Sequence, residues 1–291
     1  MLLCRFDADR LGLVEGDRVR DVTPALAILP AHTYPLPPFD PLIANLDAVK
    51  RCIRDLLPGA PSVPLEDVSL LSPVASPGKI VAAPVNYLKH LDEARGDAQI
   101  HHRNQVGEIQ RVGLFLKATS SLVGPAAGVA LKHPDRRNDH EAEVVVVIGR
   151  RGRDIPAARA HEYIAGYCVG LDMTTRGPEE RSLRKSIDTY SVLGPWMATP
   201  DEVPDPANLD FWLTVNGQPR QRANTRDLVL GIPELIELAS SFYTLHPGDL
   251  LFTGTPEGVG PVGAGDVIDV EVAGVGRMTV AVRQAQVGDP A

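Results

Sequence analysis

The sequence predicts an α+β fold rich in strands, with a small N-terminal α+β domain over residues 1–70 and a larger domain over residues 71–291. Short apolar runs bounded by turn residues outnumber the helical segments, and they do not alternate with helices as regular βαβ units do. A segment dense in proline and glycine, from Pro58 to Gly78, separates the two parts. A chain of 291 residues that is 44% hydrophobic is long enough to bury the core of such a fold.

The N-terminal domain is predicted to hold a β-hairpin and a helix. Residues 4–23 alternate apolar and polar side chains around Glu15-Gly16-Asp17, which is typical of a hairpin. Apolar residues then recur at helical spacing at Leu42, Leu46, Val49, Ile53 and Leu56. The dipeptide Pro58-Gly59 is expected to end this helix.

The elements of the larger domain are predicted from its apolar runs and turn residues. Strands are expected at residues 79–85, 112–118, 143–149, 167–172, 210–215, 249–255, 266–272 and 277–282. Helices are expected at residues 86–94, 156–167 and 233–245. Asn86 is the expected N-cap of the first helix, and Pro156 lies near the first turn of the second. Asn216-Gly217 predicts a hairpin turn.

Composition and charge exclude several classes of function. The net charge of −8 and the pI near 5.5 argue against nucleic acid or an anionic membrane as a partner, because both attract basic surfaces. The longest apolar run is far shorter than a membrane span, and the N-terminus lacks the pattern of a signal peptide. Cys4, Cys52 and Cys168 show no metal-ligand spacing, which favours reduced thiols and a cytoplasmic protein.

Two glutamates stand at the entrance of the most apolar segment, "DHEAEVVVVIGR". On a strand, Glu141 and Glu143 share one face, about 6–7 Å apart at Cα. A second apolar segment, "YCVGLDMTTRG", contains Asp172 directly before a turn. A bare pair of glutamates is usually a solvated strand end, but three acids that leave the core together could hold a cation. Their oxygen ligands would suit Mg²⁺ or Mn²⁺.

Three further segments carry candidate catalytic or binding side chains. His90 and Glu93 lie three residues apart in one predicted helix, where a carboxylate that holds the imidazole tautomer would favour a general base. The alternative is a solvated helix face. Lys185 lies in a small polar stretch and is either a surface charge or a cation for an anionic substrate. Thr255 precedes glycines whose spacing does not match a nucleotide-binding loop, so its hydroxyl is a candidate for another ligand.

A polar segment and a group of histidines leave alternatives open. Residues 95–111 form either a surface loop or a lid that orders on ligand. A non-haem iron site would need two histidines beside a carboxylate. The candidates, which are expected to be solvated in polar loops, are His101, His102, His133 and His140.

The order of these motifs resembles the fumarylacetoacetate hydrolase (FAH) family from about Lys79 to the C-terminus. The matching segments are "KIVAAPVNYLKHLDEA", "LFLKATSSLVGP", "DHEAEVVVVIG", "YIAGYCVGLDMTTR", "RKSIDTYSVLGPWM", "VNGQPRQ", "HPGDLLFTGTPEGVG" and "GDVIDVEVAGVG". The resemblance implies a β-rich roll or sandwich, usually a homodimer, and a variable extra domain over residues 1–70. It also implies a divalent metal, Mg²⁺, Mn²⁺ or Ca²⁺, held by Glu141, Glu143 and Asp172.

The same resemblance implies roles for the other candidate residues. His90 and Glu93 match a lid dyad that activates water in acylpyruvate hydrolases of this family, and Lys185 matches its active-site lysine. The expected substrate-binding residues are Tyr87, Lys117, Arg176 and Thr255. Departures from the family pattern lie around the substrate pocket, where Glu179 replaces the usual glutamine and "SLRKS" replaces "GKS". They leave the identity of the substrate open.

The function that follows from the resemblance is hydrolysis of a C–C bond in a 2,4-dioxo acid of the acylpyruvate or fumarylpyruvate type, with a metal that stabilises the enolate leaving group. The alternative is a decarboxylase or isomerase of an unsaturated 2-oxo-diacid, of the 2-hydroxyhepta-2,4-diene-1,7-dioate type, in aromatic catabolism. A non-enzymatic binding protein would have lost the metal ligands or the dyad, and this sequence has both. The expected partner is a small anionic oxo-acid.

Overall fold

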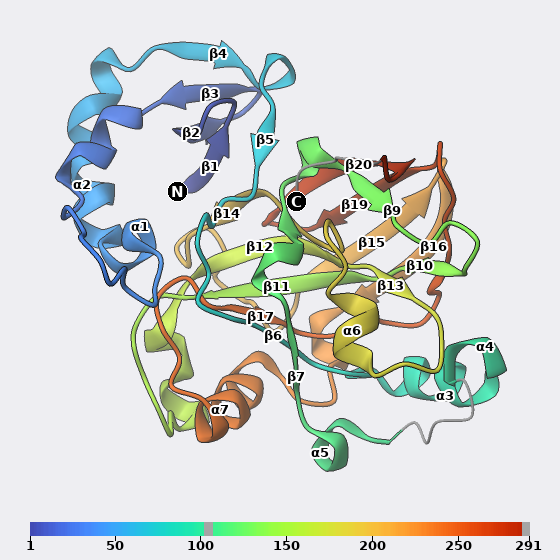
Figure 1. The fold of residues 1–291 in the computed structure, drawn as a ribbon. Helices are drawn as coiled ribbons and strands as arrows, with labels where there is room; N and C mark the ends of the chain where they lie inside the picture. Colours follow the sequence, from blue (N-terminus) through green and yellow to red (C-terminus); the bar gives the residue numbers. More distant parts are fainter. Residues whose placement is uncertain (102–106, 287–291) are drawn as a thin grey trace.

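A 12-stranded mixed sheet forms the centre of the computed structural model, which describes residues 1–101 and 107–286 (Figure 1). The main path of this sheet runs through β4 (Ser62–Pro64), β3 (Arg18–Asp21), β2 (Arg10–Glu15), β1 (Leu2–Phe6), β14 (Ser191–Ala198), β12 (Ile164–Asp172), β11 (Ala142–Ile148), β17 (Leu250–Phe252), β6 (Ile80–Ala82) and β7 (Phe115–Lys117). Two short strands pair beside this path, β5 (Leu70–Leu71) with β1 and β8 (Leu122–Val123) with β14.

Two smaller sheets and several short helices complete the described part of the chain. The five-stranded sheet has the order β16 (Gln218–Asn224), β15 (Asp210–Val215), β19 (Val267–Val272), β20 (Gly276–Gln284) and β9 (Val129–Leu131). The three-stranded sheet has the order β13 (Thr174–Thr175), β10 (Asn138–His140) and β18 (Gly260–Pro261). The α-helices are α1 (Pro41–Ala44), α2 (Leu46–Leu56), α3 (Leu88–Gly96), α4 (Ala98–His101), α5 (Ile109–Val112), α6 (Arg181–Lys185) and α7 (Ile232–Phe242).

The run of valines in β11 is explained by two cores that lie on opposite faces of the central sheet. Successive side chains of a strand point to opposite faces. Val144 and Val146 accordingly pack into one hydrophobic cluster with β15 and β19, whereas Val145 and Val147 pack into another with α2. The strand is buried along its whole length, so its only polar side chain, Glu143, has to be stabilised by the protein around it.

The N-terminal strands continue the central sheet. The predicted hairpin is present, with β2 and β3 paired across Gly16. β1 pairs with β14, so Leu3 lies opposite Met197. The proline- and glycine-rich segment between residues 58 and 78 contains β4 and β5, which pair with β3 and β1. In Figure 1 this N-terminal part lies at the upper left, away from α3, α4 and α6. A division of the chain near residue 70 stays a prediction.

Three helix predictions differ from the structure. The helix predicted from Leu42 to Leu56 is divided at Asn45 into α1 and α2. The N-cap position of α3 is Tyr87, not Asn86. The amide of Asn86 instead donates to the carbonyls of Leu230 and Thr253, each at 2.8 Å. Asn86 therefore holds the start of α3 against two distant loops, a role that no local pattern indicates.

The third difference concerns the segment predicted as a helix over residues 156–167. It forms a 3₁₀ helix, η6 (Ala157–Tyr163), and Ile164 begins β12. Pairing with β11 on one side and β14 on the other satisfies the backbone of β12 on both edges. This pairing overrides the local helical pattern. Among the described residues, no helix has the length and apolar character that a membrane crossing requires.

Candidate active site

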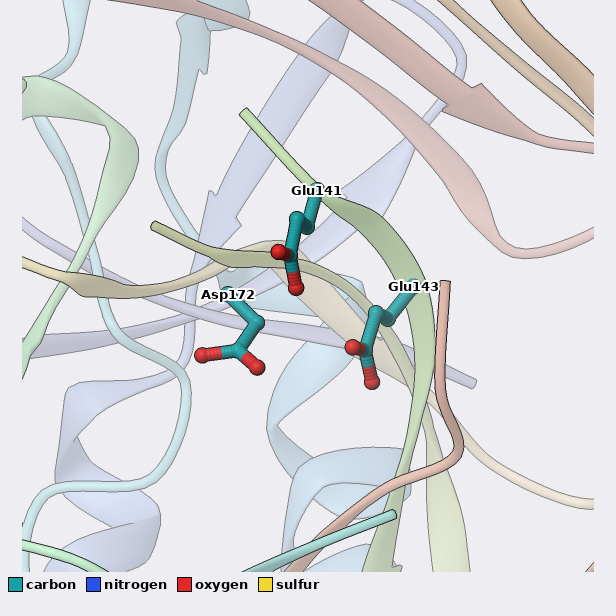
Figure 2. A group of neighbouring side chains, drawn as sticks. All are labelled: Glu141, Glu143 and Asp172. Carbon is teal, nitrogen blue, oxygen red and sulfur yellow. The ribbon is translucent and has the colours of Figure 1, made fainter. Parts of the chain in front are cut away.

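Three buried carboxylates meet where β11 begins and β12 ends. Ala142 pairs with Leu171, and the Asp172 amide donates to the Glu141 carbonyl at 2.9 Å, so Asp172 lies opposite Glu141. The strand period then places the side chains of Glu141, Glu143 and Asp172 together, and Figure 2 shows them converging. One oxygen from each lies within 4.8 Å of the others, and each residue is at most 4% exposed.

Cationic side chains surround two of these carboxylates. Lys185 Nζ lies 2.6 Å from both Glu141 Oε2 and Asp172 Oδ2. Arg176 Nη2 donates to Glu141 Oε1 at 2.9 Å, and its Nε donates to Asp139 Oδ2 at 2.8 Å. Burial opposes ionisation of Glu141, but Lys185 and Arg176 outweigh it and lower its pKa to about 2.

Glu143 differs from its two neighbours because no cation pairs with it in the part of the chain that the structure describes. Its Oε2 accepts one hydrogen bond, from the Gly254 amide at 2.7 Å. Burial, followed by the charge of Asp172, raises the pKa of Glu143 well above its ordinary value. Glu143 is thus the one carboxylate of the cluster without a cation partner among the described residues. A divalent cation bound here would stabilise its ionised form, and the all-oxygen donor set fits a hard ion such as Mg²⁺ or Mn²⁺.

The predicted histidine–glutamate dyad forms on α3. His90 is 4% exposed, and its Nδ1 lies 2.8 Å from Glu93 Oε2. The second carboxylate oxygen of Glu93 accepts from the Gly258 amide at 2.9 Å, which fixes the carboxylate against the loop after β17. Because an ionised carboxylate only accepts, the neutral imidazole carries its proton on Nδ1 and keeps the lone pair on Nε2.

Thr255 is held by a residue that the sequence did not single out, Gln221 on β16. The Gln221 amide nitrogen donates to Thr255 Oγ1 at 2.8 Å and to the Pro256 carbonyl at 3.0 Å. Its oxygen accepts from the Ala142 amide at 3.0 Å, which determines the orientation of the side-chain amide. Because Thr255 accepts from Gln221, its own hydroxyl proton is available to a ligand.

A cavity of about 460 Å³ opens beside these groups. Of the predicted site residues, those that line it are His90, Glu141, Glu143, Arg176, Lys185 and Thr255. Four predicted site residues are not among the described residues that line the cavity: Tyr87, Glu93, Lys117 and Asp172. The Tyr87 ring packs against Phe211, and its buried hydroxyl has no hydrogen-bond partner among the residues that the structure describes. Lys117 Nζ is buried against Asp172 and donates to the Tyr190 carbonyl at 2.9 Å, so it neutralises a carboxylate rather than facing the cavity.

Comparison with known proteins agrees with this arrangement. The family model for the C-terminal part of fumarylacetoacetate hydrolase matches residues 79–283. The chain belongs to the fumarylacetoacetate hydrolase family. The predicted family and its fold are thereby confirmed.

Two relatives in the FAH family extend over nearly the whole chain. Maleylpyruvate hydrolase of Aquipseudomonas alcaligenes is 56% identical over 285 residues, which cover 97% of this chain and 99% of the relative. The crystal structure of maleylpyruvate hydrolase from Sphingobium sp. SYK-6 in complex with manganese(II) and pyruvate has a TM-score of 0.83 and 43% identity. It covers 98% of this chain and 100% of that chain.

A second solved structure is less similar to this chain. 2-Hydroxyhepta-2,4-diene-1,7-dioate isomerase from Mycobacterium marinum has a TM-score of 0.70 and 28% identity, and covers 99% of this chain and 100% of that chain. Its N-terminal part aligns as well, so the structural likeness extends beyond the segment that the family model matches.

Glu179, which replaces the glutamine usual in the FAH pattern, is paired with Arg136. Arg136 contacts both carboxylate oxygens of Glu179, at 2.8 and 3.1 Å, and its Nη2 also donates to the Arg176 carbonyl at 2.8 Å. The hydrogen bonds and charge of Arg136 lower the pKa of Glu179. Glu179 therefore lines the cavity as an already paired anion.

Residues 1–101 and 107–286 do not support the alternative of a non-haem iron site built from two histidines and a carboxylate. The one group of three or more candidate metal-binding side chains found there is Glu141, Glu143 and Asp172. His102 lies outside the described residues, as does part of the predicted lid segment. The expectation that His140 is solvated is wrong, because it is fully buried and its Nδ1 lies 3.2 Å from Gln221 Oε1. His101 lies at the cavity wall.

Proposed function

We propose that this protein is a metal-dependent hydrolase that cleaves a C–C bond in a 2,4-dioxo acid of acylpyruvate type, with maleylpyruvate as the first substrate to test. The observation that carries the proposal is the cavity that His90 shares with Glu141 and Glu143, two members of the three-carboxylate cluster. Support also comes from the 56% identity to a maleylpyruvate hydrolase across nearly the entire chain.

The residues that would hold the metal are Glu141, Glu143 and Asp172. Mg²⁺ or Mn²⁺ is the proposed ion, since the donor set is entirely oxygen, and Ca²⁺ remains a candidate. The manganese(II) in the Sphingobium enzyme supports this choice. A bound divalent ion would supply Lewis-acid stabilisation of negative charge on the substrate oxygens.

The His90–Glu93 dyad would act on water. Glu93, fixed by the Gly258 amide, keeps the proton on Nδ1, and Nε2 is then free to remove a proton from a water molecule in the cavity. The hydroxide adds to the distal carbonyl carbon of the dioxo acid, and the bond between that carbon and the pyruvyl methylene breaks. The proton held on Nε2 returns to the methylene carbon, so that one carboxylic acid and pyruvate leave.

Lys185 and Thr255 would hold the substrate during these steps. Lys185 lies between Glu141 and Asp172 and lines the cavity, so its ammonium can also interact with an anionic substrate. The Thr255 hydroxyl, oriented by Gln221, would donate to the substrate carboxylate. Arg176 is already paired with Asp139 and Glu141 and would fix Glu141 in place.

Product analysis tests the hydrolase proposal against its alternative. Incubation of the purified, manganese-loaded protein with maleylpyruvate should yield pyruvate and maleate in equal amounts. The similarity to the M. marinum isomerase keeps isomerisation or decarboxylation of an unsaturated 2-oxo-diacid as the second candidate. If such a diacid is isomerised or releases carbon dioxide while acylpyruvates remain intact, the hydrolase proposal is wrong.

We also infer that the protein is a cytoplasmic homodimer with a small N-terminal α+β domain over residues 1–70, whose strands extend the central sheet. The FAH resemblance supports the dimer, and three cysteines without a disulfide support a reducing compartment. Light scattering at several protein concentrations would test the oligomeric state.

A further inference from the structure

The cavity wall carries four side chains of arginine and lysine, and three of them are already engaged. Lys185 contacts Glu141 and Asp172, and Arg176 contacts Asp139 and Glu141. Arg184 donates to two backbone carbonyls, those of Glu179 at 2.8 Å and Thr175 at 3.2 Å. The fourth is Arg181, for which the described residues provide neither an ion pair nor a hydrogen bond.

The acids closest to Arg181 in sequence are occupied elsewhere. Glu179 is bound by Arg136 through both oxygens. Glu180 is exposed and accepts from the Ser182 amide at 2.6 Å, which caps α6. Burial lowers the pKa of the Arg181 guanidinium, which is the expected effect on a cation that lacks a close counter-ion.

The position of Arg181 relative to Lys185 is set by α6 and Phe115. The two cations are four residues apart, which is about 6 Å along a helix and places them on the same face. Both lie over the Phe115 ring, Arg181 Cζ at 5.5 Å and Lys185 Nζ at 5.7 Å from its centroid. Stacking on Phe115 restricts the guanidinium, so it is held at the cavity wall one helical turn from the carboxylate cluster.

We propose that Arg181 binds a second carboxylate at the distal end of the substrate, and that the preferred substrates are therefore dicarboxylic acylpyruvates. This inference rests on the proposed function. The oxo-acid end would lie at the carboxylate cluster and Thr255, and the acyl end would extend along α6 to Arg181. A planar guanidinium matches a carboxylate through two parallel hydrogen bonds. A monocarboxylic acylpyruvate would leave this half-buried cation unpaired and would be disfavoured.

Paired substrates and matched variants test the inference. The substrates are maleylpyruvate, which carries the distal carboxylate, and acetylpyruvate, which does not. Arg181→Met keeps an unbranched side chain over Phe115 but removes the charge, Arg181→Lys keeps the charge without the fork, and Leu183→Ala changes a 66% exposed residue of the same helix. For each, kcat/KM is measured on both substrates.

The expected result is a loss of selectivity. Arg181→Met should lower the ratio of kcat/KM for maleylpyruvate over acetylpyruvate by about thirty-fold, mainly through KM, because a charged hydrogen-bonded pair is lost. Arg181→Lys should retain part of the preference, and Leu183→Ala should retain all of it. An unchanged ratio in Arg181→Met would overturn the inference and leave the hydrolase proposal intact.

A binding measurement separates this inference from the proposed function. Calorimetry with manganese present compares 2-oxopimelate with 2-oxoheptanoate, two seven-carbon chains like that of maleylpyruvate, of which only the first carries a distal carboxylate. The wild-type protein should bind the diacid more tightly, and Arg181→Met should abolish that difference. Equal affinity of the wild-type protein for both ligands would overturn the role of Arg181 even if a variant failed to fold. Failure to hydrolyse either acylpyruvate would instead contradict the proposed function.

Discussion

Gln221 donates a 2.8 Å hydrogen bond to the hydroxyl of Thr255. This contact joins β16 to the loop after β17, and it determines which way the threonine proton can point. The Gln221 side chain makes further hydrogen bonds to the Ala142 amide and the Pro256 carbonyl. One buried amide therefore connects the start of β11, the threonine loop and the cavity wall.

Replacement of Gln221 should weaken substrate binding. Gln221→Leu removes the acceptor of the Ala142 amide and the donor to Thr255, so KM for an acylpyruvate should rise about ten-fold with a smaller change in kcat. The free energy of unfolding should fall by about 2 kcal/mol, because a buried amide loses its partner. Steady-state kinetics and urea unfolding measure the two effects. Gln218→Leu, an exposed change on the same strand, is the control. Normal KM in Gln221→Leu would contradict the orienting role.

A variant of the carboxylate cluster should lose both metal binding and turnover, whereas a variant of the dyad should lose turnover alone. Asp172→Asn removes a proposed ligand that lies 2.6 Å from Lys185, so manganese affinity should fall about a hundred-fold and activity with it. His90→Ala should abolish turnover and change manganese affinity by less than about three-fold. Calorimetric titration with manganese, together with circular dichroism to monitor the fold, measures this difference. Equal loss of metal from both variants would show that the division of roles is wrong.

Glu93 should act through His90 rather than on the substrate. In Glu93→Gln the side-chain amide can still accept from Gly258, but its NH₂ would face Nδ1 and favour the wrong imidazole tautomer. We expect kcat to fall about a hundred-fold with little change in KM, and the pH profile of kcat to shift. Asp92→Asn, an exposed neighbour on α3, is the matched control. A purely structural role would instead lower thermal stability and leave the pH profile unchanged.

The stability of the metal-free protein should decrease with rising pH because of Glu143. Its folded-state pKa is raised well above the ordinary 4.5 by burial and by Asp172. Between 4.5 and the raised value, the folded protein holds a proton on Glu143 that the unfolded chain has lost, so the free energy of unfolding falls as pH rises through this window. Glu141, with a pKa of about 2, is ionised in both states there and does not offset the effect.

Glu143→Gln provides the comparison for this pH dependence. Urea unfolding in chelator from about pH 5 to about pH 8 should show a shallower decline for Glu143→Gln than for the wild type. Manganese should restore wild-type stability at the upper end of the range, because it binds the ionised carboxylates of the folded state alone. Identical slopes for the two proteins would mean that Glu143 carries no excess proton.

Local patterns in the sequence determined the parts of the site that lie on one strand or one helix. Glu141 and Glu143 are two residues apart where a strand begins, and His90 and Glu93 are three residues apart on a helix, so element periodicity alone predicts that each pair shares a face. The all-oxygen character of a three-acid group predicts a hard cation before any coordinates are known. The further roles, among them those of Lys185 and Thr255, came from the family resemblance.

Only the tertiary structure decided how polar groups from distant segments are paired. Gln221 and Thr255 are 34 positions apart, and Asn86 reaches carbonyls more than a hundred positions away. Likewise, Arg181 has no ion pair among the described residues because Glu179 is already paired with Arg136. Which donor pairs with which acceptor depends on all the polar groups that the fold brings together. Residues adjacent in the sequence therefore do not predict these pairs. The chemistry of the carboxylates and the dyad is local in origin, whereas its charge balance and substrate selectivity arise from packing.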